Sequence, residues 1–320
     1  MNLFYNKGVP FACTNSIEQG RAANRAEPGS RRFDVPAPLR LWHLTSLDAP
    51  TVAVVWALAF AWVAEVALPM WVPLLLALVV WVVYIGDRLL DARADLHTPQ
   101  IHSLRERHYF HYRHRMVLVP LAVAATSAAV VIVFSLMPAA ARERNSVLAV
   151  AAGAYFSGVH SSRKLRRLTP PKLASLNSKE FVVGLLFASG CALPALSRAA
   201  SGPRSPHWPL WSAALFFAAL AWLNCCAIER WEAVSQPTRR SRVLPAASLL
   251  GLAGLLLTAA VLYSNQPRAA ALIAAGTGSA MLLAQLDRSQ RCLTSLALRT
   301  CADLVLLSPV LLIPFAFLPR

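Results

Sequence analysis

The stretch MWVPLLLALVVWVVYIGDRLLDARAD, residues 70–95, joins a long apolar run directly to three carboxylates spaced four residues apart. On a helix, a four-residue step advances about 40° around the axis, so Asp87, Asp91 and Asp95 form a shallow spiral on one face, with about 6 Å between neighbours. Because such a face repels itself, it needs a cation, either an interleaved arginine such as Arg88 or a divalent metal. A carboxylate cluster at a membrane boundary must also face water, a partner or a ligand.

The composition around this stretch indicates a membrane protein. Hydrophobic residues make up 57% of the chain and charged residues 14%, and the mean hydropathy is +0.49. Soluble domains have roughly 45–50% hydrophobic and about 25% charged residues. We therefore predict an all-α, polytopic membrane bundle of about nine transmembrane helices. The apolar stretches near the length that crosses a bilayer are 50–68, 69–86, 116–137, 145–160, 180–197, 209–229, 243–264, 267–286 and 301–318.

The net charge of +16 follows this topology. If the N-terminus is cytoplasmic, 25 of the 31 Lys and Arg residues fall on the cytoplasmic side, as the positive-inside rule expects. The basic charge then reports topology and attraction to anionic membrane lipids, and we expect no nucleic acid as a partner. The excess of Arg over Lys is typical of a GC-rich bacterial genome, which points to a bacterial cytoplasmic membrane.

Residues 1–40 differ from the remainder of the chain. They are rich in Gly, Pro, Arg, Asn and Ser and show no apolar periodicity, and their apolar stretches are too short for a signal peptide. We expect a disordered, basic cytoplasmic tail over 1–40 and a transmembrane domain over 41–320.

Two more cytoplasmic segments carry polar residues at the level of the Asp stretch. One follows the fourth expected span and contains Tyr155, Arg163 and Lys164, with four cations within five residues at 163–167. The other follows the sixth span and contains Asn224 and Glu232. Together the segments could hold a polyanionic lipid headgroup, by metal on carboxylates and by basic side chains, while a hydrocarbon tail lies between helices. The ligand class that fits is a prenyl diphosphate, whose ionisation needs charge stabilised on the departing diphosphate.

These segments resemble the UbiA superfamily of intramembrane prenyltransferases over roughly residues 40–318. The family has nine helices, Asp-rich motifs after the second and sixth, and a Tyr/Lys-containing segment after the fourth. Aligned without gaps to Asn-Asp-x-x-Asp-x-x-x-Asp, residues 87–95 place Asp87 in the Asn slot, Arg88 in the first Asp slot, and Asp91 and Asp95 in the others. The second motif keeps an Asn and one acid, and residues 47–51 look like the entry to the family's first helix.

The resemblance implies Mg²⁺-dependent transfer of a prenyl group from a prenyl diphosphate to an aromatic or other lipophilic acceptor. It assigns roles as follows: Asp87, Asp91, Asp95 and Glu232 would bind Mg²⁺; Arg88, Tyr155, Arg163 and Asn224 would contact the substrate; and Lys164 would act with Asp91 and Asp95 in catalysis.

Other interpretations stay open. The three Asp residues could form a salt-bridged helix end, and the basic residues at 163–167 could be a positive-inside anchor. The chain could be a non-catalytic relative that binds an isoprenoid or phospholipid headgroup and assists membrane assembly. His108 and His111 have a spacing that can bind a transition metal, but the dense Arg around them favours an interfacial helix that covers the site. Glu65 and Asp303 are further acids near the membrane, and neither suggests a transport pathway.

Overall fold

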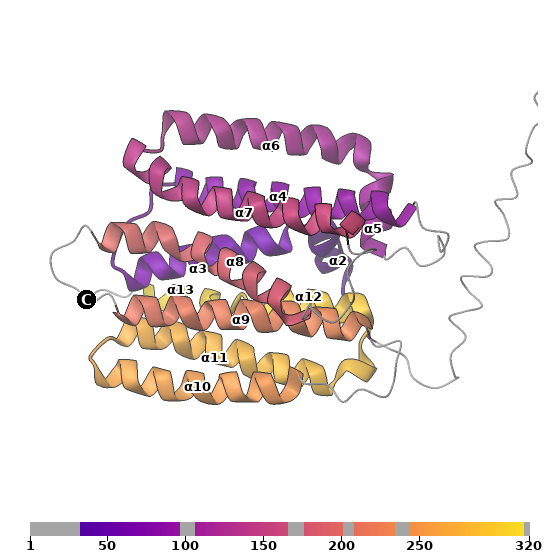
Figure 1. The fold of residues 1–320 in the computed structure, drawn as a ribbon. Coiled ribbons are helices and arrows are strands. Elements are labelled where there is room, and N and C mark those ends of the chain that lie inside the picture. The colour runs from indigo at the N-terminus through magenta and orange to yellow at the C-terminus, as the bar shows by residue number, and fades with distance from the viewer. Residues whose placement is uncertain (1–32, 97–105, 166–175, 201–207, 234–242, 317–320) are drawn as a thin grey trace, which may run out of the picture.

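The structure is a computed structural model that describes residues 33–96, 106–165, 176–200, 208–233 and 243–316. Within these ranges the regular elements are helices, apart from one isolated bridge between Phe33 and Leu293. The long helices run side by side as a bundle (Figure 1). The elements are α2 (Ala37–Leu44), α3 (Asp48–Val63), α4 (Trp71–Leu96), α5 (Glu106–Arg113), α6 (Arg115–Ser135), α7 (Ala139–Leu165), α8 (Leu176–Ala199), α9 (Trp208–Ala233), α10 (Val243–Tyr263), α11 (Pro267–Arg288), η2 (Gln290–Cys292), α12 (Ser295–Val305), η3 (Ser308–Leu312) and α13 (Ile313–Ala316).

The all-α, polytopic architecture is confirmed, but a count of nine spans is not. Among the described residues, seven helical segments are long and apolar enough to cross a membrane, and α2 with α3 forms a bent pair that adds an eighth if it counts as one span. The predicted fourth span, 145–160, lies in α7, which is not among the seven. The apolar part of α7 is diluted by Asn, Ser, Gly and His residues, which lowers its hydropathy.

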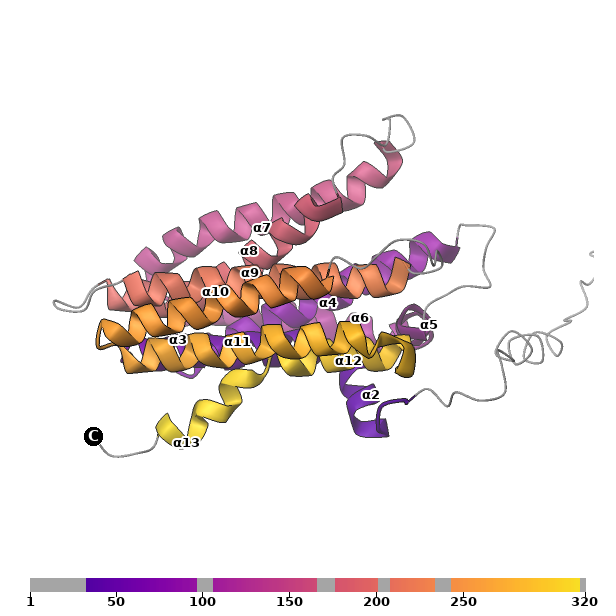
Figure 2. The ribbon, with the colours of Figure 1, turned by 90° about the horizontal axis from the view of Figure 1, so that it is seen from below.

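Two short helices, α2 and α5, mark one end of the bundle. The helices α2 and α5 lie at the end where α4, α9 and α11 finish and α12 begins (Figures 1 and 2). Part of the region expected to be a disordered tail is described at this end: Phe33 N–H donates to Cys292 O at 2.9 Å, and α2 begins at Ala37. Residues 1–32 lie outside the described part of the chain.

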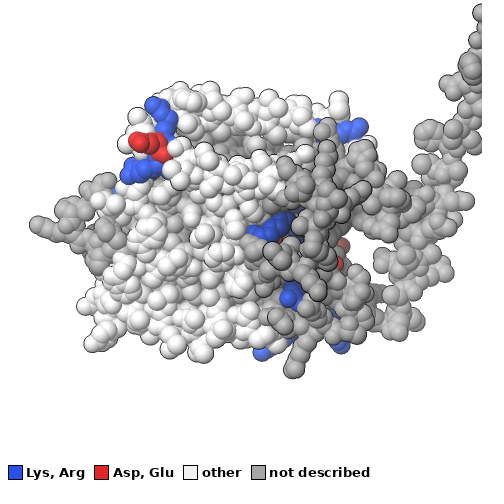
Figure 3. Space-filling view, in the orientation of Figure 1, with Lys and Arg blue, Asp and Glu red and all other residues white. Residues whose placement is uncertain are grey.

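Lipid-facing and buried surfaces separate cleanly. Figure 3 shows a broad face without Lys, Arg, Asp or Glu. The charged residues visible in this view lie toward the two ends of the bundle. Large apolar side chains are exposed along α10, for example Leu249 and Leu256 at 68% and 66%. In water such a surface would be an interaction site, whereas in a bilayer it meets lipid chains.

The core contains aromatic rings packed among small residues. Trp56 stacks on Phe217 with ring centroids 3.8 Å apart, and its Nε1–H donates to Leu306 O at 2.8 Å. Gly184 allows α8 to approach α9 closely, because a Cβ at this position would lie 2.7 Å from Trp222 N. This packing joins α3, α8, α9 and the C-terminal end of α12 and fixes the frame around the polar end.

Candidate functional site

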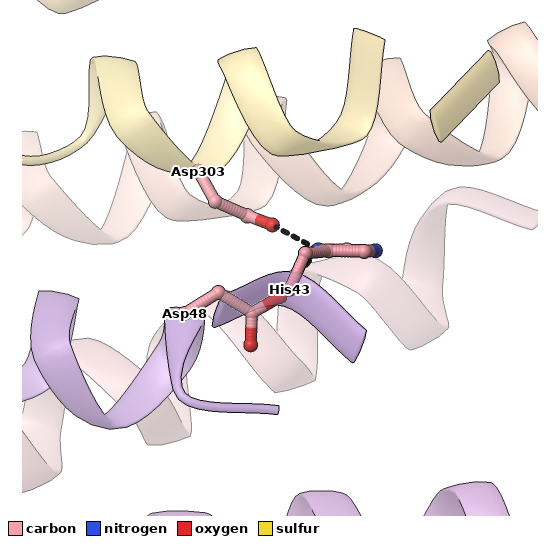
Figure 4. Close-up of side chains that lie close together, drawn as sticks. All are labelled: His43, Asp48 and Asp303. Atoms are coloured by element: carbon pink, nitrogen blue, oxygen red, sulfur yellow. Dashed lines mark ion pairs between the residues drawn. The ribbon is translucent and has the colours of Figure 1, made fainter. Parts of the chain in front are cut away.

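A buried polar cluster lies where α2, α3 and α12 meet. His43 Nδ1 is 2.7 Å from Asp48 Oδ2 and 3.5 Å from Asp303 Oδ2 (Figure 4). His43 and Asp48 are 1% and 2% exposed, and the Asp303 side chain is 17% exposed. An imidazole and two carboxylates therefore converge inside the bundle, where each isolated charge would be costly.

The chain turns sharply to form this cluster. The helices α2 and α3 meet at 87°, and Ser46 between them has φ of 58°, in the left-handed region. Asp48 begins α3, and its Oδ1 accepts a hydrogen bond from Ala49 N–H at 2.9 Å. A carboxylate at a helix N-terminus also interacts favourably with the helix dipole. The bend thus brings His43 back over the first turn of α3.

Arg88 and Asn224 extend the cluster. The Arg88 residue is 6% exposed, and its Nη2 lies 3.6 Å from Asp48 Oδ2. Asn224 Nδ2 donates to Asp303 Oδ1 at 3.4 Å. Arg88 Nη1, Asn224 Oδ1 and His43 Nε2 are buried without a hydrogen-bond partner among the described residues. The cluster therefore keeps donor and acceptor capacity that its own members do not use.

The helix α5 packs onto this cluster. His111 is fully buried, with Nε2 3.2 Å from Ser46 Oγ. Trp81 of α4 donates from Nε1 to Thr45 O at 3.0 Å, which fixes the α2–α3 bend on α4. The helix α5 lies over the bend, and an interfacial helix that covers the Asp87–Asp95 stretch stays a prediction. The side chain of His108 lies outside the described residues. His111 contacts a serine of the bend.

The stretch 70–95 forms one helix, α4, but its acids differ in environment. Asp87 is exposed, Asp91 is half-buried, and the side chain of Asp95 lies outside the described part of the chain. Arg88 points into the protein between them. An apolar groove of about 560 Å³ lies on a different face of α4, against α6, and its lining includes Val82, Gly86 and Leu89 among others.

The remaining predicted site residues are spread over the same end. Glu232 forms an ion pair with Arg299 of α12. Tyr155 of α7 donates from its hydroxyl to Lys179 O at 3.4 Å. The side chains of Arg163 and Lys164 lie outside the described residues. Of the predicted residues, the structure thus brings Arg88 and Asn224 into the cluster and places Glu232 in a separate ion pair.

Two members of the cluster were missed from the sequence as site residues, His43 and Asp48. Asp303 was noted only as an acid near the membrane, although an acid inside an apolar span is itself a signal for a site. His43 has no such signal, because it joins the cluster only through the α2–α3 bend.

The donor set of the cluster decides which metal suits it. Within the described ranges, one group of three side chains could hold a metal: His43, Asp48 and Asp303. Their ligand atoms all lie within 4.8 Å of one another. Mg²⁺ prefers an all-oxygen octahedron, whereas this group offers an imidazole nitrogen. The cluster therefore does not suit Mg²⁺. A Mg²⁺ site on Asp87, Asp91, Asp95 and Glu232 stays a prediction.

The fold and the cluster define a class, a polytopic helical membrane protein with a buried, charged polar centre near one end of its bundle. Comparison of the chain with protein-family models, with curated proteins and with solved structures finds no match.

Proposed function

We propose that the chain binds a prenyl diphosphate at the polar end of the bundle and transfers its prenyl group to an aromatic or other lipophilic acceptor in the membrane. The observation that carries this proposal is Arg88, a buried guanidinium in an apolar bundle with Nη1 free of hydrogen bonds to described residues. A guanidinium can donate two parallel hydrogen bonds to phosphate oxygens, so Arg88 suits a diphosphate.

The position of Arg88 supports the same ligand. In the alignment to the UbiA superfamily, Arg88 takes the slot of a carboxylate that holds metal for the diphosphate. A cation in this slot would contact the diphosphate directly. The expected basic residues Arg163 and Lys164 lie in the last turn of α7 and would add positive charge near the leaving group. Tyr155 on α7 would contact the substrate.

The transfer would break the bond between the prenyl C1 and the diphosphate oxygen, and the electron pair would leave with the diphosphate. The acceptor would then donate an electron pair to C1 and lose a proton. Cationic side chains lower the barrier by stabilising the negative charge that develops on the diphosphate. The resemblance adds Mg²⁺ on Asp91 and Asp95, which would supply further neutralisation.

A second function is favoured by the ion pairs. Arg88 lies beside Asp48, and Glu232 pairs with Arg299, so two motif positions have charged partners within the protein. Such pairing fits a non-catalytic protein that binds an isoprenoid or phospholipid headgroup and assists membrane assembly. Both functions share an anionic lipid as ligand and differ in whether the ligand is consumed.

The experiment that separates them uses purified full-length protein in nanodiscs with labelled farnesyl diphosphate, Mg²⁺ and a lipid extract as the source of acceptor. Transfer should produce a labelled lipid product and free diphosphate, and Asp91→Ala should abolish the product. Glu143→Gln, which alters an exposed acid at the other end of the bundle, is the matched control. Retention of intact farnesyl diphosphate would favour the binding protein. Undiminished product from Asp91→Ala would contradict the assigned site.

We further infer that the polar end faces the cytoplasm of a bacterial cell and that the N-terminus lies on the same side. The asymmetry of Lys and Arg supports this orientation. A reporter enzyme that is active only outside the cytoplasm should work when it is inserted between α6 and α7 and should fail when it is fused to the N-terminus. The reverse pattern would contradict the orientation.

A further inference from the structure

We propose that His43, Asp48 and Asp303 form a binding site for a divalent first-row transition metal, of which Zn²⁺ is the probe. This proposal does not rest on the proposed function, because metal binding is measured without any prenyl substrate. The three residues come from separate elements, α2, the start of α3 and α12, and they converge on one point inside the bundle (Figure 4).

The distance from His43 Nδ1 to Asp303 Oδ2 fits two ligands that share one ion. With metal–ligand bonds of about 2.0–2.2 Å, atoms around a tetrahedral ion lie roughly 3.3–3.6 Å apart. The His43 Nδ1 atom lies 3.5 Å from Asp303 Oδ2 and 2.7 Å from Asp48 Oδ2. The second distance is shorter than this range, so Asp48 would move slightly outward when an ion binds.

The ring of His43 is turned so that its Nδ1 edge faces both carboxylates (Figure 4). Two carboxylate oxygens lie near Nδ1, at 2.7 Å and 3.5 Å. The nitrogen and the two oxygens therefore face a common point at which all three could bind one ion. The His43 Nε2 atom is on the opposite edge of the ring, away from both carboxylates (Figure 4).

The charge of the cluster also favours a dication. Two carboxylates face each other in a buried site, and their repulsion is removed by an ion of charge +2. One imidazole and two carboxylates suit Zn²⁺ and its first-row neighbours better than Mg²⁺ or Ca²⁺, which prefer oxygen alone. Three protein ligands leave a fourth position open, the arrangement found in catalytic rather than structural zinc sites.

Arg88 shows what the open position would accept. Its Nη2 lies 3.6 Å from Asp48, and its buried Nη1 has no hydrogen-bond partner in the described part of the chain. With the carboxylates neutralised by the metal, the guanidinium charge is left to attract an anion. The site would therefore take a metal together with an anionic oxygen ligand, such as a phosphate or a carboxylate.

The test is a metal titration of the purified full-length protein after treatment with a chelator. Competition with a zinc-binding dye should give one tight Zn²⁺ site per chain, and Asp303→Asn and His43→Gln should each weaken it by at least about tenfold. His114→Gln, which alters an exposed histidine at the end of α5, should leave the affinity unchanged. Mg²⁺ should not compete at equal concentration.

A second readout guards against variants that fail to fold. Co²⁺ added to the wild-type protein should give the visible absorption of a four-coordinate site, and added inorganic phosphate should change that spectrum. The proposal is overturned if wild-type protein binds no stoichiometric Zn²⁺, because His43 and Arg88 then balance the carboxylates without a metal. It is also overturned if Asp303→Asn folds normally and retains the full affinity.

Discussion

Replacing Arg88 by Met should destabilise the protein, because it removes the cation beside the buried carboxylate of Asp48. The Arg88 Nη2 atom lies 3.6 Å from Asp48 Oδ2, and both side chains are more than nine-tenths buried. At an effective dielectric constant of roughly 20, two unit charges at this distance interact by about 4–5 kcal/mol. Loss of one partner of a buried pair costs about 3–5 kcal/mol. Because Asp48 keeps His43 and the Ala49 N–H, we expect a loss of about 3 kcal/mol in the free energy of unfolding.

The assay is thermal unfolding in detergent, followed by the fluorescence of the nine tryptophans. A loss of about 3 kcal/mol corresponds to a decrease of roughly 4–5 °C in Tm for a chain of 320 residues. Arg113→Met is the matched control, because Arg113 is exposed on α5, and its Tm should change by no more than about 1–2 °C.

The double variant Arg88→Met/Asp48→Asn separates charge from packing. Removal of the carboxylate charge should restore more than half of the lost Tm, because no buried charge then remains without its cation. The reasoning is refuted if Arg88→Met unfolds within about 2 °C of the wild type. It is also refuted if the double variant is no more stable than the single variant.

Three further experiments test the packing around the site. Gly184→Ala should lower Tm, because its Cβ would lie 2.7 Å from Trp222 N, while Gly278→Ala, with nothing within 4 Å, should leave Tm equal or higher; equal losses would contradict the close approach of α8 and α9. Trp56→Ala should cost about 3–5 kcal/mol by thermal unfolding, while Trp211→Ala at a 53% exposed position should cost far less; a similar cost for both would place Trp56 outside the core. In a double-mutant cycle, Glu232→Gln and Arg299→Met should show a coupling energy of about 1 kcal/mol or more, because their side chains are only 13% and 18% exposed. Strictly additive effects of the two substitutions would show that the ion pair contributes nothing to stability.

The spanning helices could be predicted from the sequence because long apolar runs have few alternatives in a membrane. The predicted runs 69–86 and 243–264 lie in α4 and α10, and both of these helices contain segments long and apolar enough to cross a membrane. The run 145–160 was harder to classify. It is helical in α7, but its polar residues lower the hydropathy that a span needs.

The faces of α4 were only partly predictable. The helix and the spacing of its acids follow from the sequence, but a four-residue step drifts around the axis. Over one such step the exposed Asp87 gives way to the half-buried Asp91, and Arg88 points to the interior. Which face turns inward depends on the packing of α3 and α5 against α4, and no local pattern records that choice.

The polar cluster itself depends on long-range contacts. His43 and Asp303 are 260 positions apart, and they meet because α2 bends by 87° relative to α3 at Ser46. A single polar residue in a short helix carries no sequence signal for such a meeting. Asp303 does carry one, since a buried acid in an apolar span needs a partner.

The most direct test of the central claim is the binding of labelled farnesyl diphosphate to three purified proteins: the wild type, Arg88→Met/Asp48→Asn and Arg113→Met. The wild type and Arg113→Met should retain or consume the ligand, inorganic diphosphate should compete with it, and farnesol should not. The double variant keeps a balanced interior but lacks the guanidinium, so its affinity should fall at least about tenfold. Equal binding by all three proteins, or equal competition by farnesol, would contradict the assignment of a diphosphate site to Arg88.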